Sequence, residues 1–327
     1  MSLLLITLGV LILFSFWNGF TDAANAISTI IGTRVLSPIR AVALAALGNM
    51  LGGLFGIAVA TTIGRGIIDS NIISGELVLA AITGGMIWDV ITWFFGLPCS
   101  ESHVLIGGLV GAGIASAGLS VVNYDGIINK VLIPMIFSPL LAIVIAFLIT
   151  GLVIWAFKKH NQRKINKHFK GLQIVSSFFL SIMHGSNDGQ KVAGIMTAVL
   201  LSYGVIATFE VPLWVILVSY SAMSIGTFFG GWRIVKTMAF RMTNLRPYQG
   251  FCAETGAALI LGGTSQFGLP VSTTHVISGS IMGVGATSRL SAVRWKVARS
   301  IVWAWVLTMP AAALFAFIMF NVIRIFI

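Results

Sequence analysis

The stretch GLPCSESHVLIGGLVGAG at residues 96–113 returns later in the chain as GLPVSTTHVISGSIMGVG at residues 268–285. Nine of the eighteen aligned positions are identical, including a proline, a serine and a histidine in register. A second pair keeps the same order, because NGFTDAANA at 18–26 aligns with HGSNDGQKV at 184–192. Motifs repeated in order indicate two copies of one structural unit. We therefore predict a first repeat at 1–157, a linker at 158–171 and a second repeat at 172–327.

The composition around these motifs is that of a membrane protein. Of the 327 residues, 57% are hydrophobic and 9% are charged, and the mean hydropathy is +0.99. A soluble domain of this length needs a polar surface, so the expected surroundings are a lipid bilayer. The net charge of +11 comes from short basic runs between apolar segments. That distribution follows the positive-inside rule and does not indicate nucleic-acid binding.

The apolar segments predict an all-α polytopic membrane protein. We count ten segments, at residues 3–33, 41–63, 76–97, 98–118, 131–157, 172–202, 212–231, 249–267, 268–287 and 300–323. This gives each repeat about five spans of ~20 residues, some of them broken or re-entrant. The short, glycine-rich segments 98–118 and 268–287 fit either a full span or a re-entrant hairpin. An odd number of spans inverts the second copy, an arrangement found in many secondary transporters.

The basic residues predict which loops share a side. We place the run KKHNQRKINKHFK at 158–170 in the cytoplasm and let every segment cross once. The other side then receives only Arg65, Lys130 and Arg324, and both termini lie outside. We expect that a hairpin at the two short segments would move the basic cluster at 289–299 outside. The sequence therefore favours single crossings.

Two acids interrupt apolar spans at aligned positions. The first copy has Asp22 and, one helical turn later on the same face, Asn25. The second copy has Asn187, Asp188 and Lys191. A carboxylate in mid-span costs roughly 2.5–3.5 kcal/mol, so two of them favour a function. Carboxylate and amide oxygens suit Na⁺, which we expect at Asp22 and Asp188, and an aspartate there can instead carry a proton. The structural alternatives are a buried Asp188–Lys191 pair and a helix cap by Asp22.

Each GLPxSxxH motif predicts a helix that starts inside the membrane. The prolines suit the first turn, and Ser100 and Ser272 can cap it. His103 and His275, one turn later, are expected to support the helix break. The free N–H groups and dipole of a helix start favour an anion. Hydroxyl groups surround both starts, on Ser100, Ser102, Ser272, Thr273 and Thr274. Close helix packing is expected just beyond, at Gly107, Gly111, Gly279 and Gly283. Plain capping with packed histidines is the alternative.

Three further acids need an interpretation. Glu254, within CAETGAAL, lies in an apolar span and is expected to serve the coupling ion. Glu101 fills the position that Thr273 has in the other repeat and is equally well explained as a cytoplasmic charge. Asp89 is a weaker candidate, because it is also explained as a residue at the end of a span.

These motifs resemble the paired signatures of the inorganic phosphate transporter family. The resembling stretches are NGFTDAANAIST (18–29), GLPCSESH (96–103), HGSNDGQKVAGI (184–195) and GLPVSTTH (268–275). The resemblance implies inverted repeats and a symporter coupled to Na⁺ or H⁺, often as a homodimer. The run at 158–170 is short, as in the prokaryotic low-affinity phosphate permeases, whereas animal members have a large loop there.

The resemblance also assigns residues by position. The coupling ion and phosphate region would use Asp22, Asn25, Asn187 and Asp188. Phosphate would be contacted by Ser100, Ser102, Ser272, Thr273 and Thr274, with Asn25, Gln190 and Lys191 nearby. The first copies depart from the family pattern, since Thr21 stands where an asparagine is usual and Glu101 and Ser102 replace two threonines. The family pattern therefore fits the second copies more fully than the first.

The expected function is phosphate symport across the cell membrane by alternating access, with no catalysis and no cofactor besides the coupling ion. Phosphate retains a proton that it can donate to a carboxylate, whereas sulfate does not. A sulfate or other oxyanion permease of the same family is the alternative. A channel would need a continuous polar lining, and the polar residues here cluster at helix breaks. A Ser/His enzyme would need a base and an orienting group within reach of the serine. Two copies of the motif, each at a glycine-packed helix start, suit a binding site better.

Overall fold

The computed structural model describes residues 2–326, and its backbone is helical apart from turns, short irregular loops and one isolated bridge between Ile68 and Val122. The elements of the first half are α1 (Ser2–Gly32), α2 (Pro38–Leu51), η1 (Gly52–Leu54), α3 (Ala58–Gly66), η2 (Ser70–Ile72), α4 (Gly75–Phe95), α5 (Glu101–Ala117), η3 (Leu119–Val121), α6 (Tyr124–Gly126), η4 (Ile127–Leu132) and α7 (Ile133–Phe157). Those of the second half are α8 (Gln162–Ser202), α9 (Leu213–Phe229), α10 (Trp232–Lys236), η5 (Thr237–Arg241), α11 (Pro247–Gln266), α12 (Thr273–Ser288), η6 (Leu290–Ala292) and α13 (Trp295–Phe326).

The two halves follow the same order of elements: a long helix, a bent pair, a helical hairpin and a second long helix. The bent pairs are α2–α3, with a 76° angle, and α9–α10, with a 57° angle. The hairpins are α4–α5 and α11–α12. By length and composition, α1, α4, the continuous run Tyr124–Phe157 and α13 are each long and apolar enough to cross a membrane, and each bent pair would add one broken span. In the fold, however, α4 is one arm of the first hairpin. The apolar helices thus agree with a polytopic membrane protein.

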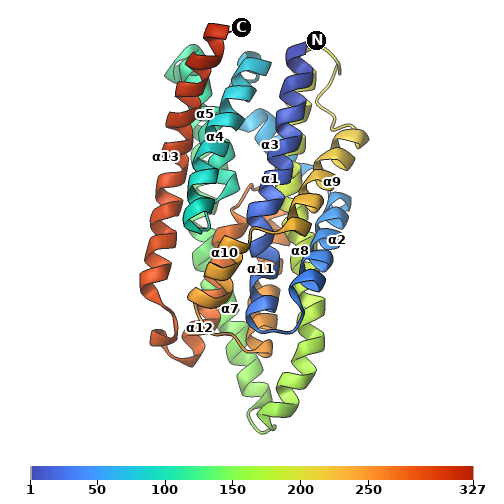
Figure 1. Cartoon of the computed structure of the whole chain (residues 1–327), viewed down its shortest axis with the longest axis vertical. Helices are drawn as coiled ribbons and strands as arrows, with labels where there is room; N and C mark the ends of the chain where they lie inside the picture. Colours follow the sequence, from blue (N-terminus) through green and yellow to red (C-terminus); the bar gives the residue numbers. More distant parts are fainter. Residues whose placement is uncertain (1, 327) are drawn as a thin grey trace.

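The termini and the turn between the halves lie at opposite ends of the bundle. Figure 1 shows both termini at the top and the α7–α8 turn at the bottom. Most of the predicted linker at 158–171 forms the first turns of α8, which begins at Gln162. Only the short stretch 158–161 connects the two long helices.

The tips of the two hairpins meet inside the bundle. Each tip begins at a glycine in the left-handed region, Gly96 with φ 65° and Gly268 with φ 67°, a conformation that suits glycine. Across the tips, Ser102 Oγ donates to the Val271 carbonyl at 3.1 Å. The chain turns back at both hairpins. Arg294 N, after the second hairpin, donates to the carbonyl of Met242, before it, and Asp69 N, before the first hairpin, donates to the carbonyl of Val121, after it. Segments 98–118 and 268–287 are therefore arms of re-entrant hairpins, and the preference for single crossings was wrong.

The reason for this error is a matter of parity. A hairpin removes two crossings at once, one for each arm, so the loops beyond it stay on the same side. The cluster at 289–299 therefore remains on the side of the α7–α8 turn with either topology. The charge asymmetry predicts the sides of the loops and does not distinguish hairpins from spans.

Glycines let each hairpin pack closely against a long helix of the other half. A Cβ at Gly111 of α5 would lie 2.0 Å from the carbonyl oxygen of Ala313 in α13. In α12, a Cβ at Gly283 would lie 2.3 Å from the carbonyl oxygen of Ile143 in α7. Gly107 and Gly279 make similar approaches one turn earlier. The close packing predicted at these glycines is confirmed, and it interlocks the two halves.

A proline lies within each of these long helices, at Pro139 in α7 and Pro310 in α13. A proline has no N–H to donate, so the carbonyl four residues earlier loses its helical partner. In α7 that carbonyl belongs to Met135, and its oxygen lies 3.5 Å from Nδ1 of His275. A groove of about 530 Å³ runs between α7 and α13 and is lined by both prolines.

Candidate functional site

The hairpin tips place two capped helix starts side by side. Ser100 Oγ accepts a hydrogen bond from His103 N at 3.3 Å, and Ser272 Oγ accepts one from His275 N at 3.2 Å, which confirms the predicted caps. The rings of His103 and His275 lie 4.8 Å apart, and the His275 ring stacks on Trp305 at 3.9 Å. Trp305 Nε1 in turn donates to the carbonyl of Pro98 at 3.2 Å. The histidines thus join the two tips to α13.

The two predicted aspartates are bridged by hydroxyl groups of the second tip. Asn25 Nδ2 donates to Thr273 Oγ1 at 3.1 Å and to Thr274 Oγ1 at 2.9 Å. Thr273 donates to Asp188 Oδ2 at 3.0 Å, and Thr274 donates to Asp22 Oδ1 at 3.2 Å. Residues far apart in sequence, on α1, α8 and α12, therefore form one hydrogen-bond chain. Their side chains are buried, with Asp22 5% and Asp188 1% exposed.

Lys191 links this chain to the first tip. Its ammonium forms an ion pair with Asp188 Oδ1 and donates to Ser102 Oγ at 2.6 Å and to the carbonyl of Val271 at 3.2 Å. The buried Asp188–Lys191 pair, considered from the sequence as a structural alternative, is thus present. It coexists with the polar cluster, because the same ammonium reaches both hairpin tips.

His184 and Asn49 were not singled out from the sequence and belong to the same cluster. His184 Nε2 lies 3.3 Å from Asp188 Oδ2, and His184 Nδ1 lies 2.9 Å from Asn49 Oδ1. His184 aligns with Asn18, the first residue of the earlier copy, and that polar alignment was the available signal. Ligand atoms of Asp22, His184 and Asp188 all lie within 4.8 Å of one another, a spacing that suits a bound cation.

Two predicted ligands are engaged in other contacts. Gln190 Oε1 accepts from the backbone N–H groups of Val59, at 2.8 Å, and Ala60, at 3.3 Å. It therefore caps the start of α3 and holds the bend of α2–α3 against α8. Asn187 Nδ2 lies 3.5 Å from the Leu269 carbonyl, and its Oδ1 has no hydrogen-bond partner among the described residues. Asn187 thus stays near the second tip, with an oxygen free to accept.

Glu254 forms a separate polar site on α11. Thr29 donates to its Oε1 at 2.6 Å and Gln173 donates to the same oxygen at 3.0 Å, while Ser176 donates to Oε2. Glu254 is fully buried. Thr29 lies one turn beyond Asn25 on α1, so the Glu254 site continues along α1 from the central cluster. The structure does not bring Glu254 together with Asp22 and Asp188.

A second acidic group lies beside the first hairpin. Thr21 donates to Glu101 Oε1 at 2.5 Å, and Cys99 Sγ donates to Asp89 Oδ1 at 2.8 Å. Ligand atoms of Asp89, Cys99 and Glu101 lie within 4.8 Å of one another, and all three residues are buried. The interpretation of Glu101 as a cytoplasmic charge was therefore wrong. Only the three-dimensional fold brings Asp89 next to the tip.

The arrangement can hold an anion and a cation next to each other. Two helix starts, one ammonium and several hydroxyl groups favour an anion. Oxygen atoms without a hydrogen-bond partner among the described residues, Asp22 Oδ2 and Asn187 Oδ1, can ligate a cation or accept a proton. A buried group of this kind needs partners, because burying an unpaired polar atom is costly.

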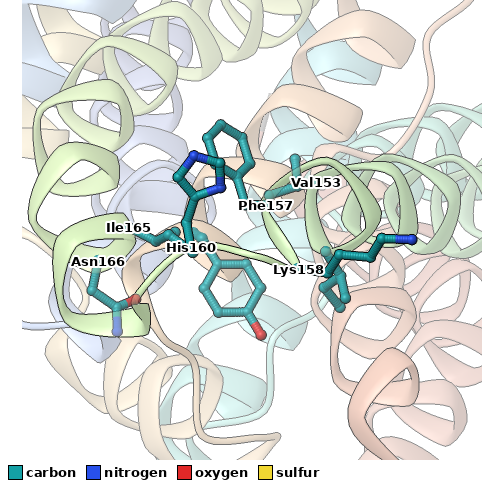
Figure 2. A pocket seen from close by; sticks show the side chains of 8 residues that line it. Val153, Phe157, Lys158, His160, Ile165 and Asn166 are labelled. Carbon is teal, nitrogen blue, oxygen red and sulfur yellow. The ribbon is translucent and has the colours of Figure 1, made fainter.

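The cleft at the α7–α8 turn has a different character. It measures about 100 Å³ and is lined mainly by apolar and aromatic side chains, with His160 at its centre (Figure 2). The Lys158 ammonium points away from the His160 ring and lies over Trp155. This cleft offers no counterpart to the cluster of carboxylates, hydroxyls and helix starts at the hairpin tips.

Known proteins match the chain over nearly its whole length. Residues 18–316 match the phosphate transporter family. The chain belongs to this family. It is 48% identical over 309 residues to a "Probable low-affinity inorganic phosphate transporter" of Rhizobium meliloti (strain 1021), covering 94% of this chain and 92% of that one. It is 42% identical to a protein of the same name from Bacillus subtilis (strain 168), covering 92% and 91%.

A solved structure of another phosphate transporter has the same fold as this family member. The structure titled "The sodium-dependent phosphate transporter" matches with a TM-score of 0.91 and 26% identity, and the match covers 100% of both chains. The helical membrane fold with bent pairs is thus shared with a phosphate transporter. The family resemblance predicted from the duplicated motifs is confirmed.

Proposed function

We propose that the protein is a symporter that carries inorganic phosphate together with a coupling cation. The observation that supports this most directly is the meeting of two helix starts around Lys191, beside the carboxylates of Asp22 and Asp188. Phosphate would contact the tip hydroxyls of Ser102, Thr273 and Thr274. The cation would be held by carboxylate oxygens beside it, and its charge would offset that of the anion.

The choice of phosphate over sulfate is supported by the carboxylates. Near neutral pH, phosphate carries a proton that it can donate to a carboxylate oxygen, and sulfate has none to donate. Asp22 Oδ2 is an acceptor without a partner among the described residues. A sulfate or other oxyanion permease of the same family stays the alternative.

Alternating access is supported by burial and by the bent helices. The site residues Asp22, Asp188 and Lys191 are at most 5% exposed, so movement must open the site before an ion can enter. The bends of α2–α3 and α9–α10 lie in the same place in each half, where a rocking motion of one half against the other would be accommodated. The coupling ion would be Na⁺ or H⁺, and the relative whose title says sodium-dependent favours testing Na⁺ first.

The cellular setting forms part of the same proposal. The protein would lie in the cell membrane, with the basic stretch at 158–170 in the cytoplasm and both termini outside. A homodimer is expected from the family resemblance.

Uptake of radiolabelled phosphate into proteoliposomes tests the proposal. A Na⁺ gradient and a proton gradient are imposed separately, with unlabelled sulfate as competitor. Uptake that follows one gradient and ignores sulfate is the expected result. Asp188→Asn serves as the site variant, and Asp125→Asn, the same change at an exposed carboxylate, serves as its control. Equal uptake by both variants would exclude the assigned site, and no phosphate uptake by the wild type would exclude the function.

A further inference from the structure

Lys191 lies within a set of oxygen atoms of the kind that ligate a small cation. Its Nζ contacts a carboxylate oxygen of Asp188, the hydroxyl of Ser102 and the carbonyl of Val271. Carboxylate and carbonyl oxygens are usual ligands of hard cations in proteins, and the hydroxyl adds a third oxygen beside them. The side chain is 1% exposed, so the ammonium is enclosed with them. The Lys191 ammonium thus occupies a position in which these oxygen atoms could otherwise ligate a free cation.

The first half has an amide in the corresponding place. Asn25 aligns with Lys191, and Thr274 aligns with Ser102. The contacts correspond as well, because Asn25 Nδ2 donates to Thr274 Oγ1 at 2.9 Å and Lys191 Nζ donates to Ser102 Oγ at 2.6 Å. Each half therefore has a nitrogen donor bonded to a hydroxyl of the opposite hairpin tip, and this nitrogen is positively charged only in the second half, at Lys191.

Asp22 is consequently left without a counter-ion in contact. The two salt bridges found among the described side chains both involve Asp188, one with Lys191 and one with His184. Asp22 accepts from Thr274 with Oδ1, and its Oδ2 is buried without a hydrogen-bond partner among the described residues.

Among Asp22, Asp188 and Lys191, two carboxylates and one ammonium leave one positive charge missing. The neighbouring acids Asp89 and Glu101, which face Asp22 from α4 and α5, supply no positive charge. A buried unbalanced charge is unfavourable, so the cluster is completed by one more positive charge.

We propose that Lys191 is a tethered counter-ion that replaces one of two coupling cations, so that each transport cycle uses a single mobile cation, at Asp22. This inference rests on the proposed symport and specifies its stoichiometry. The mobile charge is a Na⁺ ion ligated by Asp22 or a proton carried by Asp22 or by the neighbouring His184. In either case the ammonium at Asp188 never leaves the protein.

The variant Lys191→Asn tests this directly, because it places in the second half the residue that the first half has. The rate of phosphate uptake into proteoliposomes is measured against the concentration of the coupling cation. The apparent order in that cation is expected to rise from one in the wild type to two in the variant. Lys130→Asn, the same substitution at an exposed lysine, is the matched control and keeps an order of one.

A binding measurement makes the test independent of turnover. Purified protein is mixed with inorganic phosphate, and bound ²²Na⁺ and protons taken up from a weakly buffered solution are counted per protein. Lys191→Asn is expected to bind one cation more than the wild type. If the wild type shows no gradient-driven phosphate uptake, the proposed function fails, while the cation count still decides the role of Lys191.

The reciprocal variant Asn25→Lys adds a second ammonium, beside Asp22. Phosphate binding by this variant is expected to be independent of Na⁺ and to take up no coupling proton, since no mobile charge is then required. The inference is wrong if Lys191→Asn leaves the cation order and count unchanged and only raises the phosphate concentration for half-saturation. That result would make Lys191 a phosphate ligand. Should Lys191→Asn fail to insert, continued cation dependence of phosphate binding by Asn25→Lys would equally refute it.

Discussion

Replacing the hairpin glycines by alanine should separate each hairpin from the long helix that it packs against. A Cβ at Gly111 would lie 2.0 Å from Ala313 O, and one at Gly283 would lie 2.3 Å from Ile143 O. Ordinary contact begins at 3.4 Å. The obstructing atoms belong to backbone, so a side-chain rotation cannot relieve the clash. Each helix pair must move apart by about 1 Å, which also displaces the tip.

Overpacking of this kind costs about 1–3 kcal/mol. At roughly 2–4 °C for each kcal/mol, the melting temperature should fall by several degrees for Gly111→Ala and for Gly283→Ala. Phosphate uptake should fall as well, because both changes shift a helix start that the proposed site uses. The two substitutions should lower the melting temperature and the uptake by similar amounts, since the two contacts are alike.

Thermal unfolding of the purified protein in detergent, together with uptake into proteoliposomes, checks this prediction. Gly151→Ala in α7 is the control, because a Cβ there meets nothing within 4 Å. In a helix, that change alone is neutral or slightly stabilising. The reasoning is refuted if Gly111→Ala and Gly283→Ala melt at the same temperature as Gly151→Ala and transport at its rate.

Other substitutions test the polar contacts and the orientation. Asp188→Asn leaves the buried Lys191 ammonium without its partner, which costs about 3–5 kcal/mol, and it removes a proposed ligand, so uptake should be abolished while the protein still inserts; uptake assays and membrane fractionation check this, and normal uptake would contradict it. Ser272→Ala removes a helix cap, which should lower stability by about 1 kcal/mol and abolish uptake, whereas unchanged uptake would separate the cap from transport. Glu254→Gln puts an amide among three hydrogen-bond donors, so a loss of about 1–3 kcal/mol is expected in thermal unfolding, and an unchanged melting temperature would speak against the donor assignment. With the two native cysteines buried, His160→Cys should react with an impermeant maleimide only from the cytoplasmic side, and labelling of intact cells would reverse the orientation.

Much of the architecture was predictable because it depends on residues that are close in sequence and because each motif occurs in both halves. The duplicated motifs predicted helix starts capped by Ser100 and Ser272, and both caps are present. The glycine spacing predicted close packing, which also depends mainly on local sequence. The hairpins were misjudged, because hydropathy and charge report which loops share a side and not how deeply a segment enters the bundle.

Contacts between distant segments account for what the sequence did not reveal. Thr273 and Thr274 contact Asn25 across 248 and 249 positions of sequence, and no pattern within one segment predicts that they touch. The same holds for Glu101, whose burial depends on α1 and α4 closing over it. Gln190 was expected near phosphate because of its motif, and it instead satisfies the backbone of α3.

The proline in α7 creates a point at which that helix bends easily. With no N–H at Pro139, the carbonyl of Met135 is left to His275, which belongs to the tip of the second hairpin. A helix that lacks one internal hydrogen bond bends at low cost, and the missing bond lies at the level of that tip. Pro310 weakens α13, the partner of the first hairpin, in the same way. Each hairpin thus packs through its glycines against a long helix that can bend at its proline. These long helices can therefore bend as the two tips move apart, while the glycine contacts stay in place.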